Sequence, residues 1–60
     1  MAKRLMFKEN GISDQYRWDG KKWVEANDDE IHAIWQEWIA AKGADRKYDK
    51  DGFLVYFIKD

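Results

Sequence analysis

The chain has 60 residues, with 11 basic and 12 acidic side chains and a net charge of −1, which limits it to one small domain without a strong global field. It contains no cysteine and a single histidine, His32, so disulfides and thiolate metal sites are excluded, and we expect no metal and no cofactor. A domain of this size buries only about 60% of its unfolded surface, so its stability must come from tight packing of its many aromatic side chains or from association.

Two Asn-Gly or Asp-Gly pairs mark turns in the N-terminal half of the chain, at Asn10-Gly11 and Asp19-Gly20. Such pairs are the strongest short-range signal for a hairpin. They predict three antiparallel strands, Lys3–Glu9, Ile12–Trp18 and Lys21–Ala26, that form a meander. The polar residues after the first turn leave a longer loop there as the alternative.

The turn type at Asp19-Gly20 decides which aromatic side chains become neighbours. A two-residue type I′ turn, which we favour, places Tyr16 opposite Trp23 and Trp18 opposite Lys21. All three aromatic residues then share one sheet face. The alternative is a type I turn with a bulge, in which Trp23 lies opposite Trp18.

The segment 28–42 is the clearest helix. Asn27 is a favourable N-cap, and Glu30 completes a capping box with it. Lys42 and Gly43 suit the last turn and the residue after it. The expected buried stripe is Ile31, Ile34, Trp35, Trp38 and Ile39. The expected solvent face is Asp29, His32, Ala33, Gln36, Glu37 and Ala40.

A polar stretch, Ala44–Asp51, precedes a last strand, Phe53–Lys59. Arg46 and Tyr48 offer a short hairpin back across the Asp51-Gly52 turn. We therefore predict one α+β domain over residues 1–60, a small antiparallel sheet of three to four strands in the order ββαβ or βββαβ. One helix packs on one face of that sheet.

The last strand carries apolar side chains on both faces. Alternation places Phe53, Val55 and Phe57 on one face. Leu54, Tyr56 and Ile58 lie on the other. Because one helix covers only one face, we expect an exposed patch of Leu54, Tyr56 and Ile58 that docks on a partner. Under two alternatives this apolar surface is not left exposed. Either the hairpin aromatics pack beneath the helix, or the polar loop or the N-terminal segment caps the outer face.

Catalysis is not expected. The chain has one serine, Ser13, no threonine, and a histidine on the predicted solvent face of the helix. The segment Asp49–Leu54 matches the middle of an EF-hand calcium loop, but the match fails because Lys47 and Ile58 stand where ligands are needed. Asx-turn chemistry explains this segment better.

The sequence therefore favours a non-catalytic interaction module. By analogy with small phage-encoded regulators of host enzymes, we expect an inhibitor or an adaptor. Its partner is another protein or a second copy of the chain. The alternative is single-stranded nucleic acid, because Arg17 and Lys22 interleave with aromatic side chains in the hairpin 15–24. The chain has no long apolar run and no leader, so a cytoplasmic protein without membrane contact is expected. The candidate partner-binding residues are Arg17, Trp18, Lys22, Trp23, Leu54, Tyr56 and Ile58.

Overall fold

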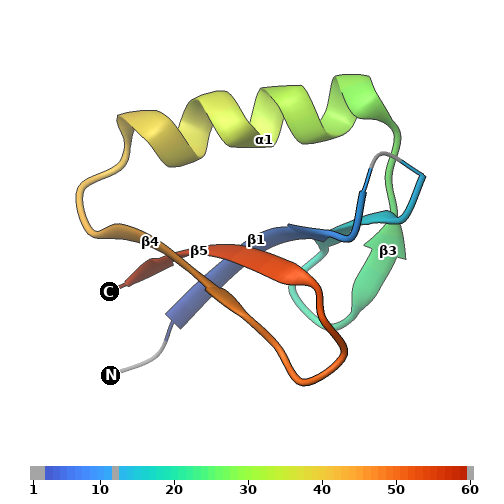
Figure 1. Cartoon of the computed structure of the whole chain (residues 1–60). Coiled ribbons are helices and arrows are strands. Elements are labelled where there is room, and N and C mark those ends of the chain that lie inside the picture. The colour runs from blue at the N-terminus through green and yellow to red at the C-terminus, as the bar shows by residue number, and fades with distance from the viewer. Residues whose placement is uncertain (1–2, 12, 60) are drawn as a thin grey trace.

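Five antiparallel strands and one helix make up the described part of the chain, residues 3–11 and 13–59 of a computed structural model. The elements are β1 (Lys3–Glu9), β2 (Gln15–Trp18), β3 (Trp23–Glu25), α1 (Asp28–Ala40), β4 (Ala44–Tyr48) and β5 (Leu54–Lys59). The strands form one sheet in the order β3-β2-β1-β5-β4, and α1 lies along one face of it (Figure 1). The α+β class with one helix on one sheet face is confirmed.

The chain order explains which strands are central. The meander β1–β2–β3 runs outward to one sheet edge, and α1 then leads from β3 to the other edge strand, β4 (Figure 1). The β4–β5 hairpin returns β5 to the middle, where it pairs antiparallel with β1 from Lys3–Lys59 to Glu9–Leu54. The first and last strands therefore hold the sheet together.

The sheet has one strand more than the upper limit of the prediction, because the whole segment Ala44–Tyr48 is β4. Its polar composition suits an edge strand, since only one of its edges is paired, from Ala44–Ile58 to Tyr48–Leu54. The carboxylate of Asp49 accepts backbone N–H bonds from Asp51 and Phe53, both at 2.9 Å, which shapes the hairpin turn. The expected Asx-turn chemistry is present there.

The β2–β3 hairpin does not have the favoured type I′ register. Trp18 lies opposite Trp23 and Tyr16 opposite Glu25, so four residues, 19–22, form the loop. The Asp19 carboxylate causes this, because it accepts the backbone N–H groups of Lys21 and Lys22, both at 2.8 Å. These bonds, that to Lys22 first, lower the pKa of the Asp19 carboxyl below its usual value.

The first hairpin also has the longer of the two loops considered for it. Strand β1 ends at Glu9, as predicted, but β2 begins only at Gln15. The backbone N–H of Asn10 donates to the carbonyl of Asp14 at 2.8 Å and closes this loop. Ile12, which the prediction placed in a strand, lies outside the described residues.

The helix begins as predicted, with both bonds of the Asn27–Glu30 capping box formed. It ends at Ala40, earlier than expected. The reason lies at Gly43, whose φ is +79° and whose carbonyl accepts the N–H of Lys59 at 2.9 Å. A Cβ on Gly43 would lie 3.2 Å from the Lys59 carbonyl oxygen, so this glycine opens β4 rather than closing the helix.

The core under α1 contains side chains from β1, β5 and the helix: Met6, Phe7, Ile31, Tyr56 and Ile58. The rings of Phe7 and Tyr56 stack with centroids 4.3 Å apart. A shift in register between Leu5 and Phe7 accommodates Met6 as an extra residue, and Met6 joins the same core.

The expected exposed patch on β5 is therefore wrong. Tyr56 and Ile58 are each only 8% exposed, and the partly buried Leu54 packs against the core cluster. The cause is that α1 covers this face of the sheet and not the other one. The Trp38 indole N–H helps to fix the helix there, because it donates to the carbonyls of Asp45 and Phe57 at 3.0 and 3.1 Å.

The opposite face of β5 is also buried, although no helix covers it. Val55 is 5% and Phe57 2% exposed. Their neighbours by register are Lys8 and Leu5 on β1. Both sides of β5 are therefore covered by residues of the same chain, and β5 offers no exposed apolar face for docking.

Candidate interaction surfaces

Four aromatic residues lie on the sheet side away from α1, and we call them the aromatic face: Tyr16, Trp18, Trp23 and Phe53. The rings of Trp18 and Trp23 pack edge to face at 5.2 Å, and those of Tyr16 and Phe53 at 5.8 Å. The ammonium of Lys8 lies 5.6, 4.7 and 4.7 Å from the ring centroids of Tyr16, Trp23 and Phe53. Lys8 thus joins rings from β2, from β3 and from the residue before β5.

The aromatic face holds only part of the predicted site. Trp18 and Trp23 share it, as the sequence indicated, but they do not pack beneath the helix. Arg17 points to the other face, where its Nε donates to Glu30 Oε2 of α1 at 2.9 Å. Lys22 is exposed in the loop that follows β2. The structure therefore separates Arg17 from the two tryptophans, as strict alternation along β2 requires.

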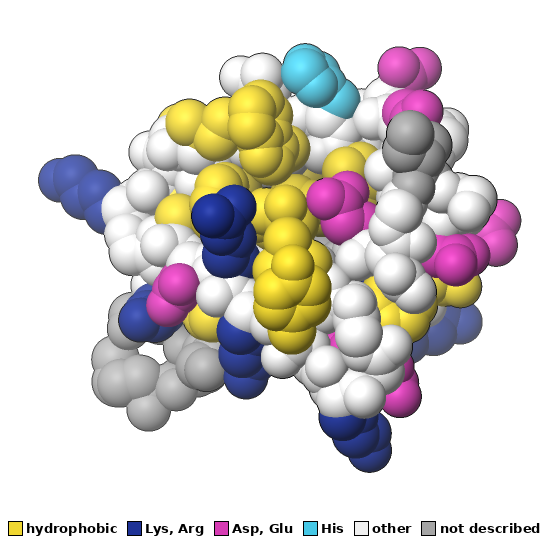
Figure 2. Space-filling model, in the orientation of Figure 1, with side chains coloured by type: hydrophobic (Ala, Val, Ile, Leu, Met, Phe, Trp, Pro, Cys, Tyr) yellow, Lys and Arg dark blue, Asp and Glu magenta, His cyan; other side chains and the backbone are white. Residues whose placement is uncertain are grey.

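A second surface, which the sequence did not reveal, lies on the helix side. Trp35 and Ile39 of α1 and Tyr48 of β4 are 39%, 51% and 73% exposed, and we call these three residues the docking surface. Tyr48 belongs to the helix side of the sheet because it pairs with Leu54, which packs against the core under α1. Figure 2 shows hydrophobic side chains exposed along α1 and again on the sheet below it.

The sequence prediction missed this surface because it placed the whole apolar stripe of the helix in the core. Ile31 is buried, and Ile34 and Trp38 are partly buried, but Trp35 and Ile39 are not. The sequence held no signal against this, because five large apolar side chains in 13 residues at that spacing are ordinary for a helix that covers a sheet on one side.

A small pocket of about 260 Å³ adjoins the docking surface. Its lining residues are Phe7, Glu9, Asp28, Ile31, His32, Trp35 and Tyr56. The Tyr56 hydroxyl donates to Glu9 Oε1 at 3.3 Å. Burial and the nearby Glu9 carboxylate raise the pKa of Tyr56 above its ordinary value of 10.0.

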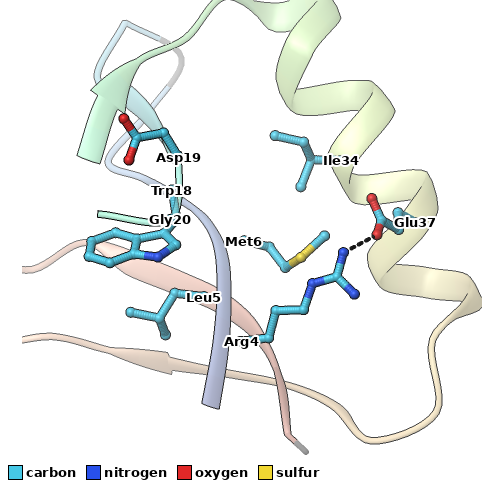
Figure 3. A pocket seen from close by; sticks show the side chains of 8 residues that line it. All are labelled: Arg4, Leu5, Met6, Trp18, Asp19, Gly20, Ile34 and Glu37. Carbon is cyan, nitrogen blue, oxygen red and sulfur yellow. Dashed lines mark hydrogen bonds and ion pairs between the residues drawn. The ribbon is translucent and has the colours of Figure 1, made fainter. Parts of the chain in front are cut away.

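A larger cavity of about 410 Å³ lies between β1, α1 and the loop after β2. Figure 3 shows Met6 and Ile34 in its apolar part and Arg4 reaching Glu37 across it. This ion pair is short, at 2.6 Å, and exposed. Because the two charged side chains neutralise each other, the cavity offers no unpaired charge from them to a ligand.

Residues 3–11 and 13–59 contain no group of three or more histidine or acidic side chains placed to hold a metal ion. The one helix found in that part of the chain is too short to cross a membrane. The chain matches no family model, no curated protein and no solved structure.

Proposed function

We propose that this chain is a non-catalytic protein-interaction module, of the inhibitor or adaptor kind, that binds another protein through its docking surface. The observation that carries the proposal is the exposure of Trp35, Ile39 and Tyr48 on one side of a domain whose other large apolar side chains, within the described residues, are buried or partly buried. Grouped exposed apolar residues typically mark interaction sites.

The composition of this surface supports the proposal. Tryptophan, tyrosine and arginine are the residue types most enriched in binding hot spots, because they bury large areas at low entropic cost. Trp35 and Tyr48 supply two of them. Arg46 of β4 supplies the third. It is exposed and pairs with Tyr56 of β5.

The outer edge of β4 does not favour simple strand addition. Asp45, Arg46 and Lys47 follow one another along this edge strand, and charged residues in that place discourage pairing with another strand. Docking through side chains on the helix side avoids this obstacle. For the same reason, we favour binding to a different protein over self-association through β4.

The aromatic face supports the nucleic-acid alternative less well. Its rings already pack against one another, and Lys8 lies over three of them. A base would have to displace these contacts in order to stack. Arg17, which the alternative needs beside the tryptophans, is paired with Glu30 on the other face.

The test is site-specific photocrosslinking in the cells that make the protein. A benzophenone amino acid replaces Trp35 in one variant and Tyr48 in another, and matched controls carry it at Ala33, on the outer side of α1, and at Lys50, in the last hairpin turn. We expect a protein adduct of defined mass from the first two positions and not from the controls.

Two further outcomes would contradict the proposal. An adduct formed mainly from a probe at Trp23, and removed by nuclease, would assign the function to the aromatic face. An adduct with a second copy of the chain, together with a dimer in sedimentation, would assign a homodimer. The double change I39K/Y48K should abolish the adduct from the probe at Trp35 while the urea midpoint shifts little, since exposed positions typically change stability by at most about 0.5 kcal/mol.

A further inference from the structure

The small pocket beside the docking surface has an aromatic interior. The stacked rings of Phe7 and Tyr56 and the side chain of Ile31 line it, and Trp35 belongs to both the pocket and the docking surface. A partner that covers Trp35 therefore also reaches the mouth of this pocket. The faces of aromatic rings carry negative charge and attract cations.

The charged groups of the pocket also favour a cationic ligand. Glu9 comes from the end of β1 and Asp28 from the first turn of α1, and no lysine or arginine of the described chain lines the pocket. His32 is the remaining polar residue, and its ring lies 6.1 Å from that of Trp35. Two carboxylates at an aromatic cavity complement a cation with an apolar stem.

We infer that the partner presents a lysine or arginine side chain that enters the small pocket between Trp35 and the carboxylates of Glu9 and Asp28. This inference rests on the proposed function, because it names the chemistry of the partner at the same surface. The aliphatic stem of the guest contacts the aromatic rings, and its charged end meets the carboxylates. Apolar residues beside it in the partner cover Ile39 and Tyr48.

One cation of the chain opposes this guest. Arg46 lies across from Tyr56 on β4 and interacts with its hydroxyl, which also donates to Glu9. The guest must therefore bind in the presence of this positive charge. Removing the charge should strengthen binding, which gives the inference a gain-of-affinity test that loss of folding cannot imitate.

The experiment is a titration of the folded ¹⁵N-labelled protein with small probes. N-acetyl-arginine amide and N-acetyl-lysine amide are compared with N-acetyl-citrulline amide, which has nearly the shape of the arginine probe without its charge. We expect the two cationic probes to shift the indole resonance of Trp35 and the amides of Ile31 and Tyr56. The citrulline probe should leave them unchanged at equal concentration.

Variants of the protein then show which of its charged side chains interact with the cationic probes. E9Q and D28N should each weaken binding of the cationic probes several-fold, R46Q should strengthen it, and D51N, which removes a carboxylate that does not line the pocket, should change nothing. Equal shifts with citrulline, or binding insensitive to E9Q and D28N, would overturn the inference. The probes need no partner, so their failure is distinct from failure of the proposed function, which the crosslinks at Trp35 and Tyr48 test separately.

Discussion

The two faces of the sheet bury the same strand by different means. Toward α1, Tyr56 and Ile58 of β5 are each 8% exposed and lie in the core that includes Ile31 of the helix. Away from α1, Val55 and Phe57 are 5% and 2% exposed without any helix above them. The face without a helix is therefore at least as well closed as the face with one.

Side chains of the neighbouring strands explain this result, since Val55 pairs with Lys8 and Phe57 with Leu5, and the Lys47 ammonium lies 5.8 Å from the Phe57 ring centroid. Strongly twisted strands bring neighbouring side chains over the centre of the sheet, and Figure 1 shows the strands fanning out below α1. Lys8 of β1 lies over rings from β2, from β3 and from the residue before β5. Large side chains on a twisted sheet thus substitute for a second layer in a chain of 60 residues.

The largest expected effect comes from truncating the most buried side chain on each face of the sheet. Phe57→Ala and Phe7→Ala should each lower the free energy of unfolding by about 3–5 kcal/mol, because both side chains are fully buried. Urea unfolding followed by tryptophan fluorescence measures both. The matched control is Tyr48→Ala, at a side chain that is 73% exposed. A loss below about 1 kcal/mol for Phe57→Ala alone would show that the side of the sheet away from α1 does not form a second core.

Much of the helix side could be predicted from the sequence. The Asn27–Glu30 capping box was predicted correctly because it depends on neighbours close in sequence. The bounds of β1 were also predicted correctly, although this strand pairs with the distant strand β5. The side of β5 that α1 covers depends on contacts such as the Trp38 indole bonds to Asp45 and Phe57, which join distant segments. Local patterns carry no information on such contacts.

The aromatic face was harder to predict for a different reason. The register of Trp18 with Trp23 depends on the Asp19 carboxylate, which captures two backbone N–H groups and widens the turn. The turn preference of an Asp-Gly pair is a statistical tendency that such a side chain overrides. The docking surface was missed because an apolar stripe does not say which of its members the sheet reaches.

The next prediction concerns a substitution that weakens the aromatic face alone. Lys8→Met keeps the apolar stem but removes the charge above three rings, and should cost about 1 kcal/mol of unfolding free energy. Lys47→Met is the matched control, because its ammonium lies over one ring, that of Phe57, at 5.8 Å. Chemical denaturation of both variants should rank Lys8 above Lys47; the reverse order would contradict the role given to Lys8.

A change of similar size loosens the helix side instead. Asn27→Ala removes the side chain that accepts the Glu30 backbone N–H at 2.9 Å and should cost about 1 kcal/mol. Asn27→Asp retains a capping oxygen and should remain close to the original protein. Circular dichroism during urea unfolding measures both variants. If Asn27→Ala and Asn27→Asp were equally unstable, the capping box would not be what holds the start of α1.

The smallest expected effect is a pH dependence confined to the helix side. The pKa of Tyr56 is raised by burial and by Glu9, so the folded state holds the hydroxyl proton more tightly than the unfolded state does. The resulting stability is complete below the ordinary tyrosine pKa of 10.0 and is lost as the pH rises through the folded value.

Tyr56→Phe tests this dependence. The variant loses the hydrogen bond to Glu9, which lowers stability by about 1 kcal/mol below pH 10.0, where the hydroxyl keeps its proton. It should lose less stability than the original protein as the pH rises above 10.0, because the shifted group is gone. Parallel curves of urea midpoint against pH would mean that Tyr56 is not held in its protonated form by the fold, and the helix side would then lack the alkaline sensitivity that its buried hydroxyl implies.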